Sequence, residues 1–188
     1  MEDKIYSEYC AILAEELQPA MGCTEPIAVA YCAALARKTL GCLPEDVQVY
    51  ASANIIKNVK SVVVPNTGGQ RGLTVAAAAG IVAGDADAKL QVLAGITPEQ
   101  VEQIAGYEKR GIVHVHPSEK DYIFDIQVRV NAAGHTAFAE IAGFHTNVIR
   151  LEQDGAVLLD RPYTEEGPKH ATDQPFDGGA HRRVCGRR

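Results

Sequence analysis

Tryptophan is absent from this chain of 188 residues, and aromatic residues make up only 6% of it. Hydrophobic residues nevertheless account for 46% of the chain. Alanine and valine supply much of that content, and such small side chains favour close packing between helices. A chain of this length can bury enough surface for one domain with a substantial core.

No basic stripe with interleaved aromatic residues occurs in the sequence, and the formal net charge is -6. Nucleic acid is therefore not an expected partner. The first residues, Met1 to Lys4, have neither the basic nor the apolar region of a secretory signal. The longest apolar stretch, residues 73–83, is too short to cross a bilayer. We expect a cytoplasmic protein with no membrane partner.

The five cysteines include no Cys-x-x-Cys pair and are irregularly spaced. This pattern favours neither a disulfide framework nor an iron–sulfur site, which requires clustered thiolates. Two of them fall within predicted helices and are expected in the core. These two are Cys10 and Cys32.

Apolar periodicity and breaker residues predict an α+β fold, with amino-terminal helices and a short strand pair followed by an antiparallel β meander. The expected helices cover residues 5–17, 24–40, 73–83 and 98–109, and the expected strands cover 47–53, 60–64, 112–116, 122–130, 136–142 and 147–152. Thr97 and Pro98 form a helix-start signal. The turn at residues 131–135 predicts a hairpin.

The sequence places Cys23 at or just before a helix start, because Pro19 ends the first helix and Thr24 suits an N-cap. Free N–H groups and the helix dipole stabilise a thiolate or a bound carboxylate there, so we expect a lowered thiol pKa. The alternative is a small apolar residue tucked under the helix.

Four stretches, in this order and spacing, carry a resemblance to a known family. They are Glu16-Leu17-Gln18-Pro19-Ala20-Met21-Gly22-Cys23-Thr24-Glu25-Pro26, Ser52-Ala53-Asn54-Ile55-Ile56-Lys57-Asn58, Val64-Pro65-Asn66-Thr67-Gly68 through Gly72, and Gly143-Phe144-His145-Thr146-Asn147. Over residues 5 to 155 the chain resembles the L-cysteine desulfidase family, which is related to the iron–sulfur L-serine dehydratases of the alpha-chain type.

The resemblance implies a lyase that converts L-cysteine to pyruvate, ammonia and sulfide. In the family, three cysteines of the carboxy-terminal part hold a [4Fe–4S] cluster, whose open iron acts as a Lewis acid on the leaving group. That part does not match here. We therefore expect the fragment to bind no cluster and to be inactive alone, with a separate cluster-bearing chain as its partner.

By the same resemblance, Cys23 and Glu25 are the catalytic candidates, with Cys23 as the base or an additional cluster ligand. The candidates for binding a small amino-acid substrate are Thr24, Ser52, Asn54, Lys57, Asn58, Thr67, Gly68, His145, Thr146 and Asn147. Each has a structural alternative. Glu25 also suits a first helical turn, the Ser52–Asn58 stretch a strand-to-turn cap, and His145 a satisfied structural position.

Residues 1–155 are predicted to form one domain, and residues 156–188 a disordered or frame-shifted tail, because the tail shows no apolar period. Three further functions stay open. One is a non-catalytic folded remnant that binds a partner or a small anion. The second is an L-serine dehydratase-like deaminase. The third is a stand-alone thiol enzyme that uses Cys23 with His145.

Overall fold

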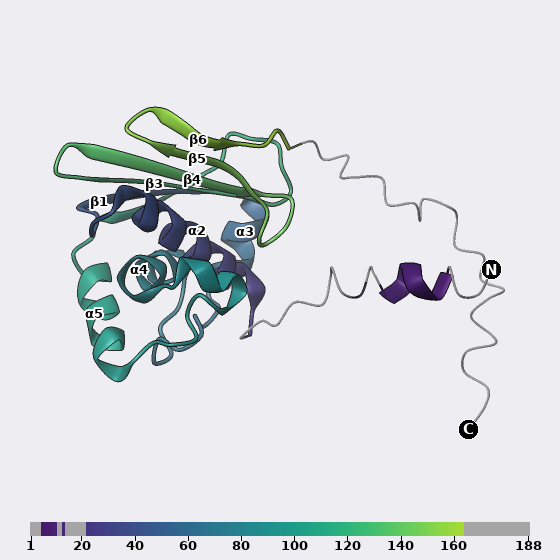
Figure 1. Ribbon diagram of the computed structural model, residues 1–188. Helices are drawn as coiled ribbons and strands as arrows, with labels where there is room; N and C mark the ends of the chain where they lie inside the picture. Colours follow the sequence, from purple (N-terminus) through teal and green to yellow (C-terminus); the bar gives the residue numbers. More distant parts are fainter. Residues whose placement is uncertain (1–4, 11–12, 14–21, 164–188) are drawn as a thin grey trace, which may run out of the picture.

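The computed structural model describes residues 5–10, 13 and 22–163, and its main feature is a six-stranded sheet covered by helices on one face (Figure 1). Helix α2 (Thr24–Leu40) contacts the sheet through β3 and β4, and α4 (Leu73–Ala83) packs on α2. Helix α5 (Pro98–Glu108) packs in turn on α4. The fold is therefore α+β, as predicted.

The sheet has the strand order β2-β1-β3-β4-β5-β6. Strand β1 pairs in parallel with β2, and every other neighbouring pair is antiparallel. The bounds of the strands and of the two short helices are β1 (Asp46–Ala51), β2 (Val113–Pro117), β3 (Asp125–Ala132), β4 (His135–Ala142), β5 (Val148–Gln153), β6 (Ala156–Asp160), α3 (Ala53–Val59) and the 3-10 helix η1 (Ala86–Gln91).

Alternation along β3 directs Ile126, Val128 and Val130 into the core, where all three are fully buried. Helix α2 lies over them and is apolar nearly all round, which suits a helix between a sheet and a second helix layer. The Cys32 thiol is buried in this layer, and donates to the main-chain oxygens of Ile126 and Ala139. The core position expected for Cys32 is confirmed.

Helices α2 and α4 cross at unusually close range. A Cβ atom added to Gly80 would lie 2.0 Å from the carbonyl oxygen of Ala30, and one added to Gly84 would lie 3.0 Å from the Cβ of Ala34. Only glycine allows the two backbones to approach this closely. The many alanines of both helices serve the same contact, and this packing holds the middle of α2 in place.

One sequence prediction about the sheet is wrong. Residues 60–64, expected as the strand beside the first one, form only an isolated bridge from Val63 to Arg71. Both edges of β1 are already occupied, by β2 on one side and β3 on the other. An apolar run of strand length has no ladder to join there, so it remains a loop.

The predicted start of the tail is also wrong. Residues 156–160 form β6, which pairs with β5 through a turn at Asp154 (φ 50°) and Gly155 (φ 81°). Two successive residues with positive φ match the twist of a two-residue hairpin. The same device at Ala133 and Gly134 joins β3 to β4, at the hairpin that the sequence predicts. Residues 164–188 lie outside the described part of the chain.

Residues 5–10 and 13 are helical, in agreement with the predicted first helix, while its other residues lie outside the described ranges. Cys10 is exposed, contrary to the core position expected for it, because nothing described packs over this face of the helix. Cys185 lies outside the described residues. Within residues 5–10, 13 and 22–163, none of the helices has both the length and the apolarity needed to span a bilayer.

Candidate functional site

Cys23 is the N-cap residue of α2, which confirms the helix-start position predicted for it. Its backbone is extended (φ -62°, ψ 123°), and its side chain makes no capping hydrogen bond. Gly22 precedes it with φ 130°, a conformation that other residues rarely adopt. A Cβ atom on Gly22 would lie 3.4 Å from Cγ of Pro65, so the loop that begins at Pro65 lies beside the start of α2.

The Cys23 thiol donates a hydrogen bond to the Glu25 carboxylate, with 3.0 Å between Sγ and Oε2. The Thr24 hydroxyl donates to the same oxygen, over 3.4 Å. Partial burial and the bond to the Glu25 carboxylate raise the pKa of the thiol. The hydrogen bond from Cys23 lowers the pKa of Glu25. The shift is opposite to the lowered thiol pKa expected from the helix start, because burial and the neighbouring carboxylate both favour the neutral thiol.

His145 completes this group of side chains from the turn between β4 and β5. Its part-buried ring packs edge-on against the ring of Phe124, with 4.8 Å between centroids. Burial lowers the pKa of the imidazole, while the nearby Glu25 carboxylate acts in the opposite direction. The site thus gathers a protonated thiol, an ionised carboxylate and a largely uncharged imidazole.

The second matched stretch lies at the start of α3, which contacts α2. Ser52 is its N-cap and is buried, with its hydroxyl donating to the carbonyl of Ile123 over 2.9 Å. This hydroxyl faces the protein interior, which agrees with the structural alternative stated for it. Three other candidates of the stretch are exposed on α3. These are Asn54, Lys57 and Asn58.

The third matched stretch forms the loop after Pro65. Thr67 is fully buried, and its hydroxyl donates to the carbonyl of Val64 over 2.8 Å. Gly68 is exposed with φ 68°, and a Cβ atom there would lie 3.1 Å from Cγ1 of Val101. Thr67 therefore stabilises the loop from inside.

The fourth matched stretch closes the β4–β5 connection. The Asn147 side-chain amide donates to the carbonyl of Ala142 over 2.8 Å, and its main-chain N–H donates to the carbonyl of Phe144. The carbonyl of Thr146 accepts from Val148. These bonds, made by Asn147 and Thr146, fix the turn that carries His145.

Two of the other stretches lie near the start of α2. The third does so where Gly22 lies against Pro65, and the fourth where the charge of Glu25 acts on the His145 imidazole. The second is linked to the fourth indirectly, because Ser52 binds the segment that carries Phe124. A shared site was predicted from the positions of these stretches at element ends, and it stays a prediction, since the Ser52 and Thr67 hydroxyls bind inside the protein.

Sequence reasoning missed the part that Phe124 plays, and it missed a buried acid pair on β3 and β4. Asp125 is 0% exposed and Glu140 is 1% exposed. Burial raises the pKa of Glu140, which forms an ion pair with Lys120. Two acids inside strands that otherwise alternate apolar residues were the available signal, since such positions rarely hold unpaired charges.

The described cysteines do not fit a [4Fe–4S] cluster. Cys32 is fully buried and bound to main-chain oxygens, Cys23 binds Glu25, and Cys10 and Cys42 are exposed on separate elements. In residues 5–10, 13 and 22–163, no three His, Cys, Asp or Glu side chains are grouped so that they could hold a metal ion. Ligands for a cluster would have to come from elsewhere.

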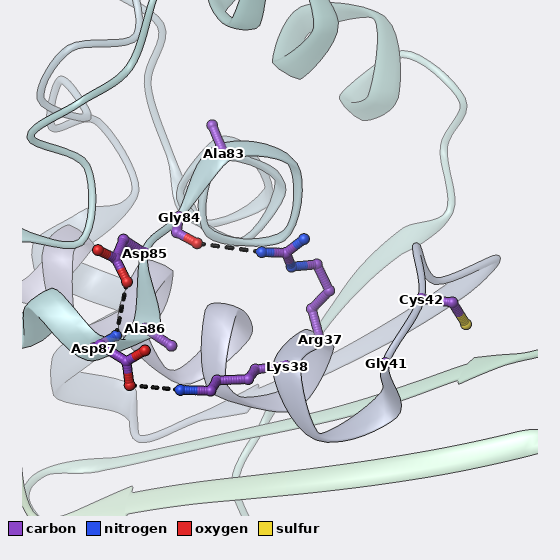
Figure 2. Close-up of a pocket in the computed structure, with 9 residues that line it drawn as sticks. All are labelled: Arg37, Lys38, Gly41, Cys42, Ala83, Gly84, Asp85, Ala86 and Asp87. Carbon is purple, nitrogen blue, oxygen red and sulfur yellow. Dashed lines mark hydrogen bonds and ion pairs between the residues drawn. The ribbon is translucent and has the colours of Figure 1, made fainter.

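A hollow of about 490 Å³ lies at the opposite end of α2 (Figure 2). Arg37 reaches across it and donates to the carbonyl of Gly84, and Lys38 forms an ion pair with Asp87. The Asp85 carboxylate accepts from the main chain of Asp87. The charged side chains around the hollow therefore bind one another or the neighbouring main chain.

The chain is similar to curated proteins that all carry the name UPF0597 protein. It is 42% identical to one from Desulfitobacterium hafniense over 173 residues, which cover 92% of this chain and 40% of that protein. It is 39% identical to one from Treponema denticola over 161 residues, covering 86% of this chain and 37% of that protein. These names state no activity. No family profile and no solved structure matches the chain.

A third relative, from Shewanella putrefaciens, is 43% identical over 151 residues, which cover 80% of this chain and 35% of that protein. The chain thus spans about two fifths of the length of these relatives or less. Most of each relative has no counterpart here.

Proposed function

We propose that this chain is the amino-terminal portion of an iron–sulfur-dependent lyase that resembles L-cysteine desulfidase, and that it is inactive without a cluster-bearing carboxy-terminal part. The reaction is L-cysteine and water to pyruvate, ammonia and hydrogen sulfide. The observation that carries the proposal is the contact of 3.0 Å between the Cys23 thiol and the Glu25 carboxylate. It lies at a helix start, where the charge of Glu25 also acts on His145.

In this proposal Cys23 and Glu25 move the protons of the β-elimination. The thiol gives its proton to Glu25, and the resulting thiolate removes the α-proton of the substrate. The substrate carbon–sulfur bond breaks, and the leaving sulfide takes the proton from Glu25. The aminoacrylate that remains becomes an imine, and water hydrolyses it to pyruvate and ammonia.

The position of Glu25 supports this division of labour, and not the two pKa shifts, because a raised thiol pKa and a lowered carboxyl pKa both oppose the transfer. A thiol that is protonated at neutral pH needs a proton acceptor within hydrogen-bond reach before it can act as a base. Glu25, with its lowered pKa, is ionised and occupies that place. The uncharged His145 imidazole does not compete as a cation for the Glu25 carboxylate.

The proposal includes a cytoplasmic location and a partner chain. The four described cysteines are free thiols, as is usual in a reducing compartment. The partner would be equivalent to the part of the Desulfitobacterium hafniense relative that lies beyond the matched 40%. That part would supply the ligands of the cluster.

The test mixes this chain with the unmatched part of that relative, anaerobically with iron and sulfide, and after removal of excess sulfide measures L-cysteine-dependent release of sulfide and pyruvate. We expect activity in the mixture only, and a loss of roughly 100-fold or more in Cys23→Ala and Glu25→Gln. Cys42→Ala, at the far end of α2, is the control and keeps full activity.

Equal sulfide release by Cys23→Ala would contradict the proposal, and so would activity of this chain alone. Pyruvate and ammonia formed from L-serine but not from L-cysteine would identify the deaminase alternative. Stable association of the two parts without turnover of either amino acid would favour the non-catalytic module.

A further inference from the structure

The ring of Phe124 is the closest described aromatic neighbour of His145. The two ring centroids are 4.8 Å apart and the ring planes meet at 64°, an edge-to-face geometry that aromatic pairs prefer. The Glu25 carboxylate acts on the same imidazole. His145 therefore packs against one apolar ring and also experiences the charge of the Glu25 carboxylate.

The main chain of Phe124 is fixed on both sides. The N–H of Ser52 donates to the carbonyl of Asp125 over 2.9 Å, and the Ser52 hydroxyl donates to the carbonyl of Ile123 over the same distance. The N–H of Gly143 donates to the carbonyl of Phe124 itself over 3.0 Å. Three consecutive carbonyl groups are thus bound to elements that border the candidate site.

Ser52 is suited to this task because it is 5% exposed and uses both its main-chain and side-chain donors on the same segment. A buried hydroxyl with a satisfied hydrogen bond is costly to displace and therefore holds a defined geometry. Gly143 has φ 81°, a conformation in which glycine is unstrained, and it starts the turn that carries His145. Ser52 and His145 are therefore linked through one segment.

We propose that Phe124 and Ser52 are positioning residues of the candidate site: Ser52 holds the segment from Ile123 to Asp125, and Phe124 thereby fixes the orientation of the His145 ring. The functional meaning of this link rests on the proposed function, in which Glu25, whose charge acts on His145, accepts a proton. The link itself is a property of the chain and can be measured without catalysis.

The ring contact has a chemical consequence for His145. Burial disfavours the charged imidazolium, so removal of the covering ring restores water and favours protonation. Glu25 favours protonation as well, but water that enters after loss of the apolar cover screens its charge, so the rise comes from the regained hydration. Loss of Phe124 therefore raises the pKa of His145. The pKa of His145 is lower in the folded chain than in the unfolded chain. The contribution of His145 to stability is therefore fully present above the pKa of the unfolded chain, and it is lost as the pH falls through the pKa of the folded chain.

The first test follows the imidazole of His145 by NMR as the pH is varied, with His145→Gln used to assign its signals. In Phe124→Leu we expect the titration midpoint to rise toward that of exposed histidines. Phe144→Leu is the matched control, because Phe144 adjoins His145 in sequence but is 55% exposed. It leaves the midpoint unchanged. An unchanged midpoint in folded Phe124→Leu would overturn the proposal.

The second test removes the anchor instead of the ring. Ser52→Ala should raise the His145 midpoint in the same direction by a smaller amount, and Ser52→Thr, which retains the hydroxyl, should restore it. Ser61→Ala, at an exposed serine, serves as the control. If Ser52→Ala titrates like the unaltered chain, Ser52 is not a positioning residue.

A third measurement needs no variant and covers the case in which Phe124→Leu fails to fold. In the unaltered chain, nuclear Overhauser contacts between the rings of Phe124 and His145 are expected, and their absence would overturn the proposal. All three readouts are independent of sulfide release. A lyase assay without turnover therefore rejects the proposed function and leaves the positioning role to be decided by the titrations.

Discussion

The two ends of α2 carry contrasting chemistry. At the amino-terminal end, Cys23 and Glu25 shift each other's pKa values, and the charge of Glu25 acts on His145. At the carboxy-terminal end, Gly41 closes the helix in the left-handed conformation, and Arg37 and Lys38 complement the negative end of the dipole. One end has ionisable groups with shifted pKa values, and the other end has the groups that terminate an ordinary helix.

The hollow near Cys42 and the groups with shifted pKa values lie at different ends of this helix. A helix of 17 residues is about 25 Å long, so the pocket near Cys42 is remote from Cys23. The difference teaches that concavity alone is a poor guide here. Shifted pKa values and the approach of three distant stretches point to the start of α2, while the hollow lies where Lys38 and Asp87 already form an ion pair.

The contrast between the two ends requires a rigid α2, and the contact with α4 provides that rigidity. Breaking this contact should have the largest effect on the free energy of unfolding. Gly80→Ala would place a Cβ atom 2.0 Å from the carbonyl oxygen of Ala30. We expect the free energy of unfolding to fall by about 3 kcal/mol, because two helix backbones must move apart. Chemical denaturation followed by circular dichroism measures the change.

Gly106→Ala is the matched control, since nothing lies within 4 Å of a Cβ atom at that position of α5. Alanine has the higher helix propensity, so this variant should gain roughly 0.5–1 kcal/mol. Equal stability of the two variants would show that α2 and α4 are not held by a close backbone contact.

A smaller effect sharpens the contrast between the thiols at the two ends. Glu25→Gln removes the carboxylate that accepts the Cys23 proton, so the thiol pKa should fall and alkylation near neutral pH should accelerate by about three- to tenfold. Peptide mass spectrometry after timed iodoacetamide treatment reads each cysteine separately, at several pH values.

Cys42 is the internal control of the same experiment, because it is exposed at the far end of α2. Its alkylation rate should not change in Glu25→Gln. Unaltered or slower labelling of Cys23 would mean that Glu25 does not hold the thiol proton, and the proposed proton transfer would fail with it.

The smallest effect is expected from the ion pair at the pocket end. Lys38 and Asp87 are in contact, but their side chains are 55% and 79% exposed. Solvent screens such a pair, so Lys38→Met should change the free energy of unfolding by less than about 1 kcal/mol. A double-mutant cycle with Asp87→Asn isolates the coupling, and a value well above 1 kcal/mol would give this end an energetic importance that the comparison denies it.

Local signals in the sequence were reliable where the physics is local. Thr97 and Gln100 form the reciprocal capping bonds that the start of α5 requires, and Pro98 lies between them as the first helical residue. Helix α4 spans residues 73–83, as its apolar run predicts. The failed strand at residues 60–64 depended instead on a partner across the fold.

The candidate site also has one part that the sequence predicts and another part that it does not. The sequence predicts Cys23 at a helix start and Glu25 in the first turn, because Thr24, Glu25 and Pro26 are typical of that position. It does not predict the state of the thiol, which follows from partial burial and from the direction of one side chain. Nor does it predict Phe124, whose role exists only through Ser52 and His145.

By itself the sequence determined the α+β class, the helix starts and stops and the hairpin turn at Gly134, because each depends on residues a few positions apart. Only the tertiary structure decided that β1 lies between β2 and β3, that Gly80 admits a second helix, and that the charge of Glu25 acts on His145. These facts depend on residues 50 to 120 positions apart, such as Ala30 and Gly80 or Glu25 and His145. Their energies arise from packing and solvent exclusion, which appear only once the chain has closed on itself.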